Sequence, residues 1–150
     1  MNHIQYTYIN YTDAIFNEAA KLRYEILFKP YGKIKEYKYD EFDKSSFHLA
    51  GICNNKIISY SRLTPEIQDN SVGKISNVVV EPKYNNMGIG LEMMKKHIQY
   101  AKENKFNYLY LHARVDTINF YRKAGFKPEG NVFISDRSGL SLQKMVFNIL

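Results

Sequence analysis

Apolar residues recur every three to four positions in two stretches of the chain, and this spacing predicts two amphipathic helices. The first helix follows Thr12 or Asp13, either of which is a suitable N-cap, and ends at residues 30–32, where Pro, Tyr and Gly occur together. The second helix spans residues 87–104, and a short third helix spans residues 117–123. The two apolar faces consist of Ile15, Ala19, Leu22 and Ile26, and of Ile89, Met93, Met94, Ile98 and Ala101.

Short runs of β-branched and aromatic residues predict the strands that these helices cover. They occupy residues 5–10, 47–53, 56–62, 74–80 and 108–113, and two terminal strands follow beyond residue 126. Asn54 and Asn55 predict a two-residue hairpin turn, because Asn tolerates the left-handed backbone of such turns. The order β-α-β-β-β-α-β-α-β-β predicts an α/β (α+β) fold, with a mixed central sheet of about seven strands flanked by helices.

The length of 150 residues fits a single domain, residues 1–150, and the net charge of +6 favours an anionic partner. No apolar run approaches the roughly 18–20 residues that cross a bilayer, and the first residues lack the order of a signal peptide. We therefore expect a cytoplasmic protein that does not enter a membrane. The one cysteine, Cys53, fits a reducing compartment and is interpreted as a structural thiol.

Metal and nucleic-acid chemistry receive little support from the sequence. The four histidines stand far apart and form no pair with metal-ligand spacing, so no metal site is expected. Thirteen tyrosines and the positive charge keep a nucleic-acid-binding module as an alternative. The aromatic residues are scattered, however, and no helix-turn-helix or RNA-recognition signature is present, so this alternative is disfavoured.

The most informative segment is VVVEPKYNNMGIG, residues 78–90, which joins a predicted buried strand to the second helix. Gly88 and Gly90 allow the backbone to bend, so that successive amide groups can point into one concavity. These amides lie at a helix N-terminus, where they have no intrahelical acceptor and the helix dipole is positive. The segment therefore predicts a binding site for a phosphate or pyrophosphate, although a tight turn with only a structural role has the same pattern.

The turn, together with NFYRKAGFKP about thirty residues later, resembles the GNAT superfamily of acyl-CoA-dependent N-acyltransferases. The family's phosphate turn is Q/R-x-x-G-x-G/A, and residues 85–90 match both glycines. Asn85 stands where the family has Gln or Arg, so one long polar side chain is missing. The segments LRYEILFKPYG (residues 22–32) and DEFD (residues 40–43) further resemble the ElaA-like branch.

The resemblance implies a sheet that splays between its fourth and fifth strands, with acetyl-CoA as co-substrate and no metal. The main chain of Val78 and Val80 would then bind the pantetheine arm, and the amide near Val79 would polarise the thioester carbonyl. Asn119 is a further contact to the cofactor arm, although a capping role on the surface explains it equally well. The implied cofactor-binding residues are Val78, Val79, Val80, Asn85, Asn86, Met87, Gly88, Ile89, Gly90, Leu91 and Asn119.

Two residues are predicted to move protons. Tyr121 occupies the position of the family's thiolate-protonating tyrosine, and the alternative is a core tyrosine whose hydroxyl is satisfied. The carboxylate that many relatives carry before the phosphate turn is absent from residues 74–77. His112 on the partner strand has a suitable intrinsic pKa for a general base, and the alternative is a packed histidine.

The acceptor is expected to be an amine of a small molecule or a peptide. Asp40 and Glu41, in the acidic segment that also contains Glu36 and Asp43, are the predicted contacts to it, against the alternative of a solvated loop. The family resemblance also allows a homodimer. Two further alternatives keep the fold and change the chemistry: transfer from another acyl-CoA, or CoA binding without catalysis.

Overall fold

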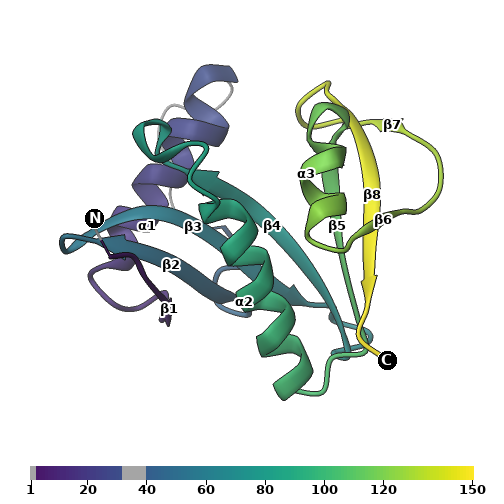
Figure 1. The fold of residues 1–150 in the computed structure, drawn as a ribbon, viewed down its shortest axis with the longest axis horizontal. Helices are drawn as coiled ribbons and strands as arrows, with labels where there is room; N and C mark the ends of the chain where they lie inside the picture. The colour runs from purple at the N-terminus through teal and green to yellow at the C-terminus, as the bar shows by residue number, and fades with distance from the viewer. Residues whose placement is uncertain (1–2, 32–39) are drawn as a thin grey trace.

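In the computed structural model, which describes residues 3–31 and 40–150, the strands form one mixed sheet (Figure 1). The order across the sheet is β1-β2-β3-β4-β5-β8-β6, with β7 paired to another part of β8. Only β4 and β5 are paired in parallel among these strands. The bounds are Gln5–Ile9 (β1), Phe47–Cys53 (β2), Lys56–Pro65 (β3), Val72–Val80 (β4), Tyr108–Arg114 (β5), Lys127–Pro128 (β6), Phe133–Ile134 (β7) and Ser141–Asn148 (β8).

Helices cover both faces of the sheet. In Figure 1, α2 lies in front of β2–β4, α1 lies behind them, and α3 lies in front of β5 and β8. α1 continues into a π-helical turn and then a 3-10 turn, and two further 3-10 turns precede α2 and α3. The bounds are Phe16–Arg23 (α1), Tyr24–Phe28 (π turn), Lys29–Tyr31 (3-10), Pro82–Tyr84 (3-10), Ile89–Glu103 (α2), Val115–Thr117 (3-10) and Ile118–Lys123 (α3).

Two apolar clusters hold these layers together. On one face, Met93 and Met94 of α2 are fully buried against Ile75 and other residues of the sheet. On the other face, Phe16 and Ala19 of α1 pack on the side of the sheet that carries Tyr60 and Val79. Because β3 and the end of β4 are covered on both faces, they form a rigid frame for the segment that follows β4.

The mixed sheet with three helices is confirmed, and so is the hairpin turn at Asn54 and Asn55, whose φ angles are 50° and 63°. The predicted N-cap of the first helix is wrong. Short turns over residues 10–16 delay α1 until Phe16, no side chain caps it, and the Asp13 carboxylate instead accepts the amide of Asn10 at 3.2 Å. The terminal strands are also more divided than predicted, because β6 and β7 each pair with β8 over two residues only.

Candidate active site

The sheet opens between β4 and β5. Their parallel pairing is confined to residues 72–74 of β4 and 108–110 of β5, and beyond this point the strands diverge toward the upper edge of Figure 1. The splay predicted between the fourth and fifth strands is therefore confirmed. The β4 edge that faces the opening, from Ile75 to Val80, has main-chain groups that β5 does not pair.

A bulge at Asn77 accompanies this divergence. Asn77 adopts a left-handed φ of 56°, and the register between β3 and β4 shifts there: Ser76 pairs with Arg62, whereas Val79 pairs with Tyr60. The extra residue bends β4 away from its neighbour, as bulges do. The amide nitrogen Nδ2 of Asn77 is buried and has no hydrogen-bond partner within the described ranges 3–31 and 40–150.

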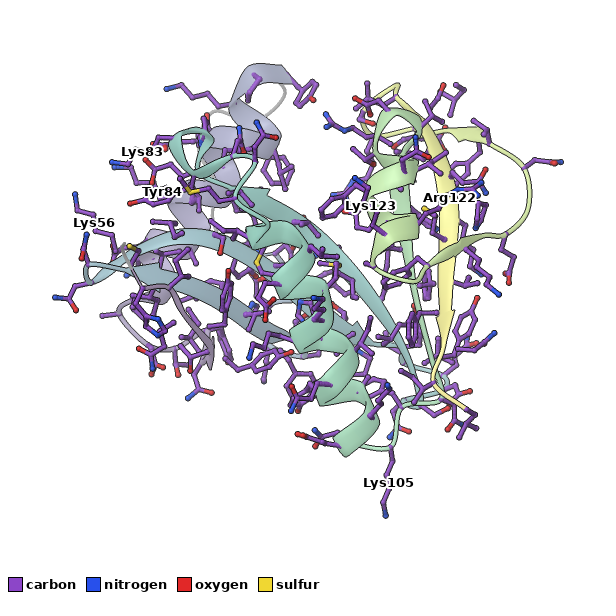
Figure 2. The ribbon with its side chains drawn as sticks, viewed as in Figure 1. Lys56, Lys83, Tyr84, Lys105, Arg122 and Lys123 are labelled. Atoms are coloured by element: carbon purple, nitrogen blue, oxygen red, sulfur yellow. The ribbon has the colours of Figure 1, made fainter. Side chains whose placement is uncertain are left out.

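The segment after β4 turns sharply into α2. Asn86 and Gly88 both have left-handed φ angles, 63° and 76°, and Gly88 directly precedes the helix. The amide of Glu92 donates to the carbonyl of Gly88 at 3.0 Å, so helix geometry leaves the amides of residues 89–91 without an intrahelical acceptor. Figure 2 places Lys83 and Tyr84 beside this turn and Arg122 and Lys123 on α3, across the opening.

The two glycines of the turn have different roles. A Cβ on Gly88 would meet nothing within 4 Å, so its left-handed conformation is what requires glycine. A Cβ on Gly90 would lie 2.8 Å from Cζ of Phe120, so this position requires glycine because α2 and α3 approach closely. The sequence pattern indicated both glycines but gave no sign of the contact with Phe120, which lies thirty residues away in the chain.

A cleft of about 410 Å³ occupies the fork between β4 and β5. Tyr121 of α3 and His112 of β5 both line it, Tyr121 as a buried residue and His112 as an exposed one. Tyr121 is buried, and its ring lies edge-on to Phe120, with centroids 4.8 Å apart. Burial raises the pKa of Tyr121 to about 12, against the opposing effect of Arg114, so the phenol carries its proton at neutral pH.

His112 faces the cleft from β5. Its ring lies 5.1 Å from the ring of Phe133, nearly perpendicular to it. Burial lowers the pKa of His112, and the charges of Lys74 and Lys144 lower it further. The imidazole is therefore neutral at pH 7 and has a lone pair that can accept a proton.

The structure separates the remaining predicted cofactor residues by their exposure. Val79 is buried under α1, whereas Val78 and Val80 are half-buried on the α2 side. Asn85, Asn86 and Met87 are exposed, and Asn119 is exposed on α3. The side chains of these four residues thus point to solvent, while the valine side chains pack and leave only their main chain available.

The two predicted acceptor contacts lie in different surroundings. Asp40 accepts two hydrogen bonds from Nη1 of Arg62, at 2.8 and 2.7 Å, so its charge is already compensated. Glu41 is exposed. Glu36, from the same acidic segment, lies outside the described residues. The role of Asp40 and Glu41 in acceptor binding stays a prediction.

Next to Asp40 the structure contains a group of buried charges that sequence reasoning missed. Asp43 forms a two-point ion pair with Arg23, with both contacts at 2.9 Å, and also contacts Arg62 at 2.9 Å. Nε2 of His48 donates to the Asp43 carbonyl at 2.7 Å, and Nδ1 of His48 is hydrogen-bonded to the Tyr60 hydroxyl at 2.6 Å. We call these residues the arginine–aspartate cluster: Arg23, Asp40, Asp43, His48, Tyr60 and Arg62.

The cluster also has electrostatic consequences. Burial alone would raise the pKa of Asp43, but the hydrogen bond and charge of Arg23 outweigh it and hold the pKa below its usual range. The only sequence sign of this cluster was a basic residue, Arg23, directly after the apolar Leu22 on the first helix.

Within residues 3–31 and 40–150, no group of three potential metal ligands comes together. In the same part of the chain, no helix is both long and apolar enough to cross a membrane.

The profile of the acetyltransferase (GNAT) family matches residues 13–126. An uncharacterized N-acetyltransferase of Pyropia yezoensis, ycf52, is 29% identical over 79 residues, which are 51% of this chain and 44% of the relative. The chain thus spans less than half the length of that curated relative.

Two solved structures share the fold. Escherichia coli ElaA is 22% identical, with a TM-score of 0.77 over 97% of this chain and 99% of that one. An aminoglycoside 6'-N-acetyltransferase complexed with coenzyme A is 13% identical, with a TM-score of 0.79 over 97% of each chain. These identities show the fold alone and do not fix the branch. The forked sheet, the glycine turn before α2 and the profile match over most of the length lead to one conclusion: the chain belongs to the acetyltransferase (GNAT) family.

Proposed function

We propose that residues 1–150 act as one N-acetyltransferase domain that transfers an acetyl group from acetyl-CoA directly to an amine, in a ternary complex. The observation that carries the proposal is the fork itself: β4 loses its pairing with β5 at the level where Tyr121 and His112 line a common cleft. The turn after this strand leads to the start of α2, where the first amides have no intrahelical acceptor.

The residues around the fork fit coenzyme A. The turn supplies helix-terminal amides for a pyrophosphate, and the space beside Gly88 is open. The β4 edge from Val78 to Val80 supplies main-chain donors and acceptors for a pantetheine amide. Asn85 offers a shorter side chain than the Gln or Arg of the family pattern, so the main chain supplies most of the phosphate contacts.

Acetyl-CoA supplies the activated acyl group as a thioester. The amine nitrogen bonds to the thioester carbonyl carbon, and the carbon–sulfur bond breaks. The neutral imidazole of His112 accepts the proton that the amine must lose, and the phenol of Tyr121 donates its proton to the departing sulfur. A main-chain amide of the β4 edge near Val79 polarises the carbonyl, and Asn119 contacts the cofactor arm.

A titration of the full chain with CoA, followed by thiol release with a panel of amines and acyl-CoAs, tests this proposal. We expect CoA binding and release of free CoA in the presence of at least one amine. The acyl-CoA panel distinguishes acetyl transfer from transfer of longer chains. Binding without turnover of any amine would instead support a CoA-binding protein without catalysis.

A pair of glycine variants locates the cofactor. Gly88→Asp places a carboxylate in the proposed phosphate site, and Gly130→Asp places the same group at a position of equal conformation, with φ of 77° and nothing within 4 Å. We expect Gly88→Asp to lose CoA affinity and Gly130→Asp to keep it, since the backbone strain is matched. Equal affinity in the two variants would place the cofactor elsewhere.

Two weaker expectations belong to the same proposal. The single, buried Cys53 is compatible with a cytoplasmic protein. A homodimer stays a prediction, which light scattering of the purified chain would test.

A further inference from the structure

A second cavity, of about 620 Å³, adjoins the cleft. Ser76 and Asn77 line both, so the two spaces meet at the bulge of β4. The side cavity continues down β4 to Lys74 and is closed by the segment after β3, by Tyr110 of β5 and by Arg137 of the turn between β7 and β8. A ligand that reaches the fork from this side would pass along these residues.

Lys74 is the residue of this cavity whose charge is best placed to bind a ligand. Its side chain is half-buried, and within residues 3–31 and 40–150 no carboxylate lies within ion-pair distance of its ammonium. Burial lowers the pKa of Lys74; Glu66 raises it, and Arg62 and Arg137 lower it further. An ammonium held in such surroundings is stabilised when an anion binds next to it.

The acidic groups of the cavity are already engaged. The hydroxyl of Tyr110 donates to Glu66, and the hydroxyl and amide of Ser71 donate to Asp69, at 2.6 and 3.0 Å. Two other cations lie in the wall: Arg62 contacts Asp40 and Asp43, and Arg137 also has contacts of its own. Lys74 therefore remains as the charge that an incoming group can pair with.

The position of Lys74 on β4 sets how far a bound anion lies from Asn77, where the two spaces meet. Lys74 precedes Asn77 by three residues on an extended strand, a separation of about 10 Å between Cα atoms. The Lys74 side chain spans part of that distance, and the ligand must span the rest. Asn77, with its unpartnered Nδ2 between the two spaces, offers a further hydrogen bond on the way.

We propose that the acceptor is an amine that carries a carboxylate several bonds from the reacting nitrogen, and that Lys74, in the side cavity, binds this carboxylate. The inference rests on the proposed function and specifies its acceptor. The sequence pattern predicts that carboxylates of the acidic segment recognise the cationic amine. Because Asp40 and Asp43 are paired with arginines, we infer instead that Lys74 recognises an anionic group of the acceptor.

Matched amines test the inference. ε-Aminocaproate and its amide, ε-aminocaproamide, share the reacting nitrogen and the chain, and differ only in the charge that Lys74 would contact. With the CoA-loaded chain we expect the carboxylate to bind about tenfold or more tightly than the amide, as charged hydrogen bonds of this kind contribute. With acetyl-CoA we expect the same preference in kcat/KM, mainly through KM.

Lys74→Met removes the charge and keeps the length of the side chain. We expect this variant to lose the preference by weakening the carboxylate while the amide is unchanged, and Arg137→Gln to reduce it less. Lys105→Met is the control, because Lys105 projects away at the far end of α2 (Figure 2). We expect it to keep the full preference.

The outcomes separate this inference from the proposed function. Equal binding of acid and amide to the wild-type chain, or an equal loss of both in Lys74→Met, would overturn the inference even if turnover is observed. Selective binding of the acid that depends on Lys74, without turnover, would support the inference and contradict the proposed transfer chemistry.

Discussion

The arginine–aspartate cluster and the cleft are both built from polar groups on the sheet, yet they differ in how those groups are satisfied. In the cluster, Asp43 meets two guanidinium groups and both ring nitrogens of His48 have partners. In the cleft and its side cavity, no hydrogen bond joins Tyr121, His112 or Lys74 to any side chain of residues 3–31 and 40–150.

The difference separates polar groups that stabilise the fold from polar groups that can bind a ligand. A buried charge that its neighbours fully compensate contributes to the fold and has no capacity left for a ligand. A buried or half-buried polar group without such neighbours, such as Tyr121 or Lys74, is costly unless a ligand completes it. On this basis Asp40 and Asp43 of the acidic segment are part of the frame, acceptor binding by Glu41 stays a prediction, and the unpartnered groups at the fork are the further functional candidates.

The largest effect is expected from breaking the cluster. Asp43→Asn removes the charge of the two-point ion pair with the fully buried Arg23, and we expect the free energy of unfolding to fall by about 3–5 kcal/mol. Urea denaturation measures the loss. Asp69→Asn, at an exposed turn, is the control and should cost far less. A loss below about 1 kcal/mol for Asp43→Asn would mean that the cluster is not part of the frame.

On the other side of the comparison, Tyr121→Phe removes one hydroxyl from the cleft. We expect kcat to fall about 100-fold because the departing sulfur loses its proton donor. The affinity for CoA should change little, since the ring and its contacts with Phe120 remain. Tyr100→Phe serves as the control, because Tyr100 of α2 packs against Tyr8 and does not line the cleft. An unchanged kcat at every pH would remove Tyr121 from the mechanism.

Substitutions in the glycine turn before α2 are expected to have a smaller effect. Gly90→Ala should cost about 2 kcal/mol of stability through its collision with Phe120, and Gly88→Ala about 1 kcal/mol through backbone strain alone. Thermal unfolding of both variants compares them. Adding Phe120→Leu should recover part of the loss in Gly90→Ala and none in Gly88→Ala. Additive losses in both pairs would show that Phe120 is not what excludes a side chain at position 90.

The smallest expected effect is a pH dependence of the free energy of unfolding, caused by a buried histidine whose ring nitrogens both have hydrogen-bond partners. His97 is fully buried between Tyr8 and Ser61, at 2.9 and 2.7 Å, and burial lowers its pKa to about 3. The unfolded chain takes up this proton near pH 6.5 and the folded chain does not, so stability falls as the pH drops. We expect a loss of about 1 kcal/mol between pH 7 and 5.5 from this residue.

Urea denaturation across this pH range checks the prediction. His97→Gln should flatten the profile, and His3→Gln, at an exposed position, should leave it unchanged. A profile equally steep in His97→Gln would assign the acid sensitivity to other groups, such as His48, whose pKa burial also lowers.

Much of the fold could be predicted because its signals are local. Helical spacing located α2 to within two residues, and Asn54 and Asn55 located the hairpin because a left-handed turn depends on those two residues alone. The start of α1 was missed because the apolar spacing continues across turns that the backbone makes before Phe16. The glycine turn was found for the same local reason, whereas the contact of Gly90 with Phe120 was not.

What the sequence determined by itself is the succession of elements, the phosphate-type turn before α2 and the family resemblance, since each depends on residues close together in the chain. Only the tertiary structure decided which charges are paired. Arg23, Asp43 and Arg62 lie up to 39 positions apart in numbering, and their contacts exist only because α1 and β3 pack on one another. The same packing pairs those charges with one another, and within residues 3–31 and 40–150 Lys74 has no ion-pair partner.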